Sequence, residues 1–238
     1  MLRGLRGWNA AVVASAAIVV LVAMALGVGW LSTVHARTTT YSVSNAVTRV
    51  ELRIASGRAV IVGTSGQDVR VIRSDRFAFG HAARERRSIA GGVLRISSAC
   101  PRIVLGSCSA SYELAVPETV AVSVQTTQGD VRVTGFRGGA AVQTRSGSID
   151  VEAYCGFTLA ATSGAGDVHI SAACAPRRLE LRTGSGDAVA LVPPGRYRVS
   201  ASSGSGRERV TGLVSDPRAP FSIDAHSGSG SVAVEGGP

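Results

Sequence analysis

Six glycines, spaced by 18 to 24 residues, mark an internal repeat in the C-terminal half of this 238-residue chain. They are Gly129, Gly147, Gly166, Gly186, Gly206 and Gly230. A hydroxyl residue lies three positions before each glycine, and apolar residues lie seven and five positions before it. Apolar residues return two and four positions after the glycine, except that the copy at Gly206 has Glu208. A repeat of this length is typical of architectures in which neighbouring units stack.

Apolar residues at every second position predict β-strands with one buried face, and the glycine supplies a turn between two strands. The chain is therefore expected to be all-β. Matching inward positions at a period of about 20 residues favour a single β-solenoid-like repeat domain, in which coils stack with parallel strands. An antiparallel β-sandwich or meander is the alternative. We expect an interior row of Val131, Ile149 and Val168, and an outward row of Arg132, Asp150 and His169.

The N-terminal segment has the character of a membrane anchor. Residues 7–34 contain no charged side chain, and as a helix they would be about 42 Å long, more than the ~30 Å hydrocarbon core. Arg3 and Arg6 precede this segment, which predicts a cytoplasmic N-terminus and an exported body. The expected organisation is a tail at 1–6, a transmembrane signal-anchor helix at 7–34 and an extracytoplasmic β-repeat domain at 37–238. The alternative is secretion after cleavage following Ala36.

Four cysteines follow this segment, and an even number in an exported chain suggests disulfides. Cys155 and Cys174 each lie eight residues after a repeat glycine, so stacking would bring them about 4.8 Å apart, within bonding range. Cys100 and Cys108 could close a short loop between two predicted strands. We therefore predict the pairs Cys100–Cys108 and Cys155–Cys174.

The part of the body before the repeats is less regular. Alternating apolar residues between 50 and 116 predict further strands, with a longer loop at 74–90. The dense run Arg84–Arg87 carries its own acid, Glu85, and is expected to be a solvated loop. No linker separates this part from the repeats, so we expect one continuous domain.

Charge suggests the class of partner. All 25 basic residues are arginine, and the absence of lysine excludes a Walker-A phosphate loop and Schiff-base chemistry. The net charge is +9, and the body keeps +7 once Arg3 and Arg6 are left out. A basic exported surface attracts anionic partners, here an anionic envelope polymer or a protein partner, and we expect no nucleic acid. A soluble surface without a special ligand is the alternative, because the arginines look scattered along the sequence.

Asp130, Asp167 and Asp187 each follow a repeat glycine directly, and stacking would make Asp167 and Asp187 neighbours. Paired carboxylates could cleave a polysaccharide or bind calcium. Aspartate after glycine is also good turn chemistry, because its side chain accepts hydrogen bonds from nearby backbone amides. The four histidines stand alone, and we predict no metal site, no cofactor and no catalytic residue.

The run Cys100-Pro, Cys108, Tyr112-Glu-Leu-Ala-Val-Pro117, the segment Thr127-Gln-Gly-Asp-Val-Arg-Val-Thr-Gly135 and the further Ser-Gly repeats resemble a known family. This is the "putative adhesin" family of bacterial β-strand-repeat proteins, the domain of unknown function numbered 4097. The likeness covers most of residues 45–235. It implies an extracytoplasmic, often membrane-anchored β-repeat protein with no established catalytic residues.

These expectations combine into one functional prediction. We expect a non-enzymatic protein, held in the cytoplasmic membrane by its N-terminal helix, that acts as a structural or adhesin-like binding module at the bacterial cell envelope. The alternative is an enzyme that processes envelope polysaccharide with the repeat-turn aspartates. The ligand, the oligomeric state, the handedness of the solenoid and calcium binding by Asp167 and Asp187 are left open.

Overall fold

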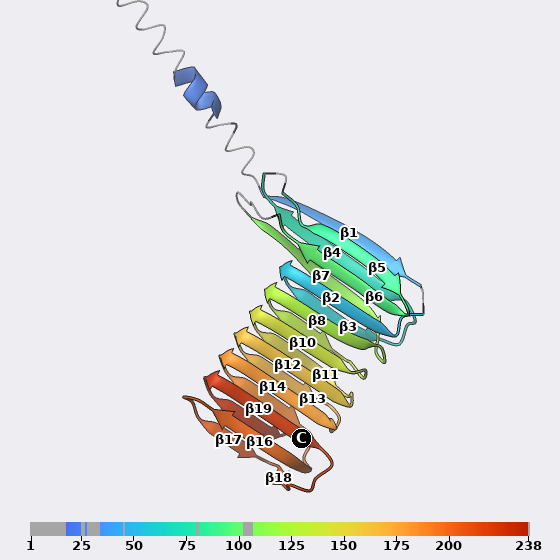
Figure 1. Ribbon diagram of the computed structural model, residues 1–238, viewed down its shortest axis with the longest axis vertical. Coiled ribbons are helices and arrows are strands. Elements are labelled where there is room, and N and C mark those ends of the chain that lie inside the picture. Colours follow the sequence, from blue (N-terminus) through green and yellow to red (C-terminus); the bar gives the residue numbers. More distant parts are fainter. Residues whose placement is uncertain are drawn as a thin grey trace, which may run out of the picture.

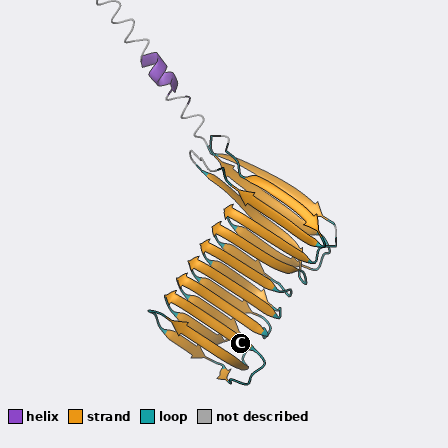
Figure 2. Ribbon diagram, viewed as in Figure 1, coloured by secondary structure: helices purple, strands orange, loops and turns teal. Residues whose placement is uncertain are grey.

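The computed structural model describes residues 18–24, 27, 34–44, 46–79, 81–101 and 107–237. Within these ranges the strands form two ten-stranded sheets that enclose one apolar core, as a flattened solenoid (Figure 1). The body consists almost wholly of strands and turns (Figure 2). Strands of successive repeats pair in parallel, as β10 does with β12 and β11 with β13. The prediction of an all-β solenoid-like fold is confirmed, and the antiparallel alternative is wrong for the repeats.

Each coil gives one strand to each sheet. Sheet 1 has the order β1 (His35–Val43), β4 (Val69–Phe77), β7 (Cys108–Pro117), β3 (Ala59–Thr64), β9 (Val131–Thr134), β11 (Ile149–Tyr154), β13 (Val168–Ala172), β15 (Ala188–Val192), β20 (Val232–Gly236) and β17 (Glu208–Thr211). Sheet 2 has the order β5 (Arg84–Ala90), β6 (Val93–Ala99), β2 (Arg49–Ser56), β8 (Ala121–Gln128), β10 (Ala140–Ser146), β12 (Thr158–Ala165), β14 (Arg178–Ser185), β19 (Ser222–Ser229), β16 (Arg196–Ser203) and β18 (Val214–Ser215).

The predicted interior row is confirmed. Ile149 pairs in register with Val131 on one side and with Val168 on the other, and all three are at most 1% exposed. The next residue along each strand forms the predicted outward row, Arg132, Asp150 and His169. The alternation in the sequence therefore reports directly which face of each strand is buried.

The coils do not stack in simple sequence order at the two ends. The last repeat, β19 with β20, lies between the coil of β14 and β15 and the coil of β16 and β17. At the other end, β2 and β3 lie between the coil of β6 and β7 and the coil of β8 and β9. The strands β2, β3, β19 and β20 are thereby paired on both edges, which protects them from fraying. Consecutive stacking holds from β8 to β15 only.

The copy that breaks the apolar rule forms the end of the described solenoid. Glu208 on β17 occupies an inward position, in register with the buried Val232 of β20. Its carboxylate accepts a hydrogen bond from the backbone N–H of Ser203 at 2.7 Å. Within the described residues no further coil covers this end, so a charged side chain there meets solvent, as expected of a capping repeat.

The turns between the two strands of each inner coil require glycine. Gly166 has a φ of +136°, which residues with a side chain rarely adopt. A Cβ at this position would collide with the backbone oxygen of Gly147 in the neighbouring coil. A φ in the same region occurs at Gly57, Gly129, Gly147, Gly186 and Gly230, whereas Gly206, in the end coil, lies outside it.

The recurrent hydroxyl three positions before the glycine joins adjacent turns. The hydroxyl of Ser163 donates to the carbonyl oxygen of Gly147 at 2.8 Å, and that of Thr183 donates to Gly166 at 2.8 Å. The same contact is made by Thr144, Ser203 and Ser227. Thr126 is the exception, because its hydroxyl is buried without a hydrogen-bond partner among the described residues. The sequence showed this position but not its role.

Both predicted disulfide pairs are present in the structure. Cys155 and Cys174 join adjacent coils, with Cα atoms 4.6 Å apart. Cys100 and Cys108 link the end of β6 to the start of β7, with Cα atoms 6.0 Å apart. Stacking of equivalent positions in adjacent coils is therefore sufficient to bring Cys155 and Cys174 within bonding distance.

A polar network fills the interior at the N-terminal end of the solenoid. The Arg73 guanidinium donates to Asp75 at 2.9 Å and to Glu85 at 3.4 Å. Tyr112 and Tyr41 also donate their hydroxyl protons to Glu85, at 2.9 and 3.1 Å. Burial, followed by the negative charge of Glu85, raises the pKa of Tyr41 to about 12. The network satisfies polar groups at a place where the apolar core ends.

The longer loop expected at 74–90 is wrong for most of its length, and the solvated loop expected at Arg84–Arg87 is wrong. Residues up to 77 belong to β4 and residues 84–90 form β5, which pairs with β6 at the edge of sheet 2. Because neighbouring residues of a strand point to opposite faces, Glu85 enters the network while Arg84 and Arg86 face outward. The acid in this run is thus separated from the two arginines beside it.

The predicted anchor falls mostly outside the described residues. Of residues 7–34 the structure describes 18–24, 27 and 34, and residues 18–24 are helical. Among the described residues no helix has the length and apolar character needed to cross a membrane. The division into residues 1–6, 7–34 and 37–238 stays a prediction, and β1 already begins at His35.

Replacing Gly166 with alanine should lower the free energy of unfolding by about 2–4 kcal/mol, because a side chain adds backbone strain and a collision with the next turn. The control is Gly66→Ala, where a Cβ would meet only the Thr64 hydroxyl at 3.7 Å. Chemical denaturation followed by circular dichroism measures both. Equal stability of the two variants would contradict the stacked-turn account.

The hydroxyl contacts can be tested with a pair of Thr→Val substitutions that keep side-chain shape. Thr183→Val should cost about 1–2 kcal/mol of unfolding free energy, because a buried hydrogen bond to Gly166 is lost. Thr126→Val should be neutral or stabilising, because its hydroxyl is buried without a partner. The same denaturation experiment compares them, and a larger loss at Thr126 would refute this explanation.

Candidate functional site

The turn aspartates form hydrogen bonds between coils. Asp167 accepts from the backbone N–H of Asp187 at 2.8 Å, and Asp187 accepts from that of Ser231 at 2.7 Å. Asp130 accepts from the backbone N–H of Ser148 at 3.0 Å. Asp167 and Asp187 are therefore neighbours, as the repeat predicted, and each carboxylate is engaged with the backbone of the next turn. This arrangement is the turn chemistry that aspartate provides after glycine.

The surroundings of Asp167 and Asp187 differ from those of a catalytic or metal-binding carboxylate. Asp167 and Asp187 are exposed at the edge of the solenoid, unlike a general acid that is held in an apolar pocket. In the part of the chain that the structure describes, no group of three or more His, Cys, Asp and Glu side chains could hold a metal ion. The contacts present explain these aspartates as structural.

Asp167→Ala should lower the free energy of unfolding by about 1 kcal/mol, because the backbone N–H of Asp187 loses its cross-coil acceptor. The loss should be the same in calcium and in EDTA. Asp68→Ala, at an exposed loop position, is the control and should leave stability unchanged. If calcium stabilised the parent chain but not the Asp167 variant, the purely structural role would be wrong.

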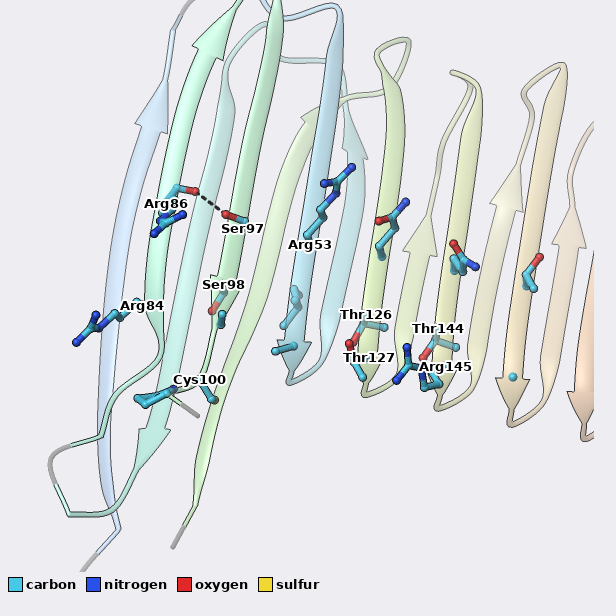
Figure 3. Close-up of a pocket in the computed structure, with 18 residues that line it drawn as sticks. Arg53, Arg84, Arg86, Ser97, Ser98, Cys100, Thr126, Thr127, Thr144 and Arg145 are labelled. Carbon is cyan, nitrogen blue, oxygen red and sulfur yellow. Dashed lines mark hydrogen bonds between the residues drawn. The ribbon is translucent and has the colours of Figure 1, made fainter. Parts of the chain in front are cut away.

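A groove of about 1280 Å³ lies over the outer face of sheet 2, toward its N-terminal strands. It crosses β5, β6, β2, β8 and β10 and reaches β12 (Figure 3). None of the described residues that line it is acidic. The charged side chains that line the groove are therefore all positive.

Four arginines line this groove, which we call the arginine groove. Arg84 and Arg86 come from β5, Arg53 from β2 and Arg145 from β10. Pairing sets their positions, because Arg86 is in register with Ser97, which is in register with Arg53. In Figure 3 Arg84 and Arg86 lie on one side, Arg53 lies between, and Arg145 lies on the far side.

No described residue neutralises these four side chains. All four are exposed, and none forms an ion pair or side-chain hydrogen bond with a described residue. Elsewhere on the same face, by contrast, Arg95 pairs with Glu51 at 3.0 Å. Uncompensated like charges in a hollow raise the local positive potential and attract anions. Each guanidinium also presents five N–H donors that match carboxylate or phosphate oxygens.

Neutral polar side chains lie between the arginines. Ser97, Gln125, Gln143 and Thr162 line the groove from four different strands. Amides and hydroxyls both donate and accept hydrogen bonds, so they can bind the hydroxyl groups of a ligand. Chemically, the groove can hold an anion that also carries hydroxyl groups.

The sequence interpretation of the arginines as scattered is wrong for these four, because strand pairing gathers positions far apart in the chain. One signal was available. Arg53 lies four residues before Gly57 and Arg145 lies two before Gly147, and both offsets are outward in every repeat. Arg84 and Arg86 have no such glycine, so their place beside Arg53 required the structure.

Comparison with known proteins finds a family model and solved structures that are similar to this chain. Residues 102–212 match the family model described as Toastrack DUF4097. A solved structure of a "putative cell adhesion protein" from Clostridium sporogenes is similar, with 13% identity over 85% of this chain and 100% of that chain and a TM-score of 0.49. A "putative adhesin" from Bacteroides fragilis has 13% identity over 84% and 97% of the two chains and a TM-score of 0.42.

No curated protein matches the chain in sequence. The family resemblance carried by the Cys100–Gly135 motifs and the Ser-Gly repeats is confirmed by the match over residues 102–212. Residues 102–212 are thus similar to the Toastrack domain of the DUF4097 family.

Proposed function

We propose that this protein is a non-enzymatic module, anchored in the cytoplasmic membrane, whose β-repeat body lies outside and binds an anionic polymer of the bacterial cell envelope. The arginine groove carries the proposal. Four exposed guanidinium groups without a counter-charge share one open hollow with neutral hydrogen-bonding side chains. A surface of this kind binds anions rather than performing acid–base chemistry.

Three features support the location. Residues 7–34 are uncharged and follow Arg3 and Arg6, which favours a cytoplasmic N-terminus. Two disulfides suit an oxidising compartment outside the cytoplasm. Cleavage after Ala36 would remove two residues from β1, including His35, which pairs with Phe77. We therefore favour the retained anchor.

The absence of enzymatic activity is supported by what the candidate carboxylates do. Asp130, Asp167 and Asp187 accept hydrogen bonds from backbone amides of the next turn. A retaining or inverting glycosidase needs one carboxyl group that is protonated near neutral pH and a second that is ionised. The exposed turn positions offer no apolar surroundings that would separate the two roles.

Binding and topology can be tested together with membrane vesicles that contain the full chain. Labelled inorganic polyphosphate should bind right-side-out vesicles, where the body faces the medium, and not inverted ones. Arg53→Ala with Arg145→Ala should weaken binding by about tenfold or more, which equals the loss of about 1.4 kcal/mol. Binding of the parent chain should also weaken as salt is raised.

The matched control is Arg70→Ala with Arg209→Ala, which removes the same charge from two exposed positions of sheet 1. This variant should bind polyphosphate like the parent chain. Equal losses in the two double variants would mean that net charge, not the groove, is responsible. Binding confined to inverted vesicles would overturn the proposed topology.

A further inference from the structure

Arginines recur on alternate strands along the outer face of sheet 2. On most strands these arginines occupy outward positions four or two residues before the turn glycine. On β5 and β6, which have no such glycine, the equivalent positions are those in register with these. We call this set of positions the band. The arginine strands are β5, β2, β10 and β14, with one strand between each. Neighbouring strands lie about 4.8 Å apart, so the arginines repeat about every 10 Å. The side chains are Arg84, Arg86, Arg53, Arg145 and Arg182.

The band contains no acidic residue from β5 to β16. The acids of this face, Glu51, Glu180 and Asp224, lie one row farther from the turns. Glu51 is paired with Arg95, which lies outside the band, whereas Glu180 and Asp224 are both paired with Arg182 of the band. The outer face of sheet 1 differs, because acids are spread across it at Glu113, Asp150, Glu152 and Glu235. A continuous acid-free path therefore exists on one face only.

The strands between the arginines carry hydroxyl and amide groups. Ser97 lies on β6, Gln125 and Thr127 lie on β8, and Thr162 lies on β12. On β12, β14 and β19 the band position two residues before the turn glycine is itself a glycine, namely Gly164, Gly184 and Gly228. No side chain therefore projects from these positions. Charged and neutral recognition groups thus alternate along an open path.

We propose that the band binds a linear polysaccharide that carries one anionic group for every two sugar rings and lies across the strands, along the solenoid axis. Two rings of an extended chain span roughly the same ~10 Å that separates the arginine strands. The anionic groups would meet the guanidinium groups, and the intervening hydroxyls would meet Gln125 and Thr162. This inference rests on the proposed function and names the chemical class of its ligand.

Other polyanions fit the band less well. The band contains no Phe, Tyr or Trp, and its one imidazole, that of His226, is hydrogen-bonded to the Ser202 hydroxyl at 2.9 Å. Single-stranded nucleic acid is held by stacking of bases on aromatic side chains, and protein partners are anchored by aromatic residues in pockets. A single imidazole provides neither a row of stacking platforms nor an aromatic anchor in a pocket, whereas side chains that hydrogen-bond to hydroxyl groups recur along the band.

Hyaluronan oligosaccharides test the spacing, because they carry one carboxylate for every two rings. The full chain, purified in a nonionic detergent, is titrated with oligomers of four, six and eight rings. Affinity should rise with length and exceed that of the four-ring oligomer by about tenfold or more at eight rings, when four carboxylates meet four arginine strands. An eight-base single-stranded oligonucleotide should bind more weakly.

A charge reversal within the band sharpens the test. Thr162→Glu places an acid between Arg145 and Arg182 and should weaken binding of the eight-ring oligomer by about tenfold. The control is Ser171→Glu on β13, which adds the same charge to the next strand of the chain but on the outer face of sheet 1. The control should bind like the parent chain, and circular dichroism checks that both variants are folded.

The outcomes separate this inference from the proposed function. If oligomers of four and eight rings bind equally well and only the groove arginines matter, the extended path is wrong while the proposed function stands. If the oligonucleotide binds more tightly than hyaluronan, the polysaccharide assignment is wrong. If neither hyaluronan nor polyphosphate binds, both proposals fail.

Discussion

Close stacking of glycine turns is the constraint on which the rest of this molecule depends. The backbone oxygen of Gly147 occupies the space where a side chain on Gly166 would begin. Hydroxyl side chains before the glycines and aspartates after three of them then hydrogen-bond one turn to the next. Because the turns superimpose, the strands that leave them cannot slip, and a slip of one residue would expose every apolar side chain. The same register aligns the outward residues of neighbouring strands in rows across each sheet.

A stacked fold must end somewhere, and here both ends are polar. At the N-terminal end, Arg73, Glu85 and Tyr112 satisfy one another inside the sheets. At the other end, Glu208 stands at an inward position and bonds to the backbone of its own coil. The last repeat is also inserted between earlier coils, and three of the four edge strands, β1, β5 and β17, carry charged residues. Charged edges and polar ends oppose further strand addition by other chains.

The distribution of charge links the scaffold to its proposed role. Acids on the outer face of sheet 2 are paired with Arg95 and Arg182, which do not line the groove, and this leaves the groove arginines uncompensated. Strand alternation contributes as well, because it buries Glu85 while Arg84 and Arg86 stay outside. An arrangement of this kind costs the protein little stability, since exposed charges are well solvated. It does supply a directional attraction for an anionic chain.

The sequence by itself determined the local rules. Alternation of apolar residues identified the buried faces, the glycine period identified the turns, and Cys155 and Cys174 at equivalent offsets identified a bond between coils. Tertiary structure alone decided what depends on non-local pairing. The insertion of β19 and β20 between two earlier repeats and the placing of Arg86 near Arg53 arise from hydrogen bonds between segments far apart in the chain, whereas the strand at 84–90 is one arm of a local hairpin with β6. The repeat pattern indicates whether each side chain points into the core or outward. Which residue of another strand lies next to it is decided by the pairing of the strands.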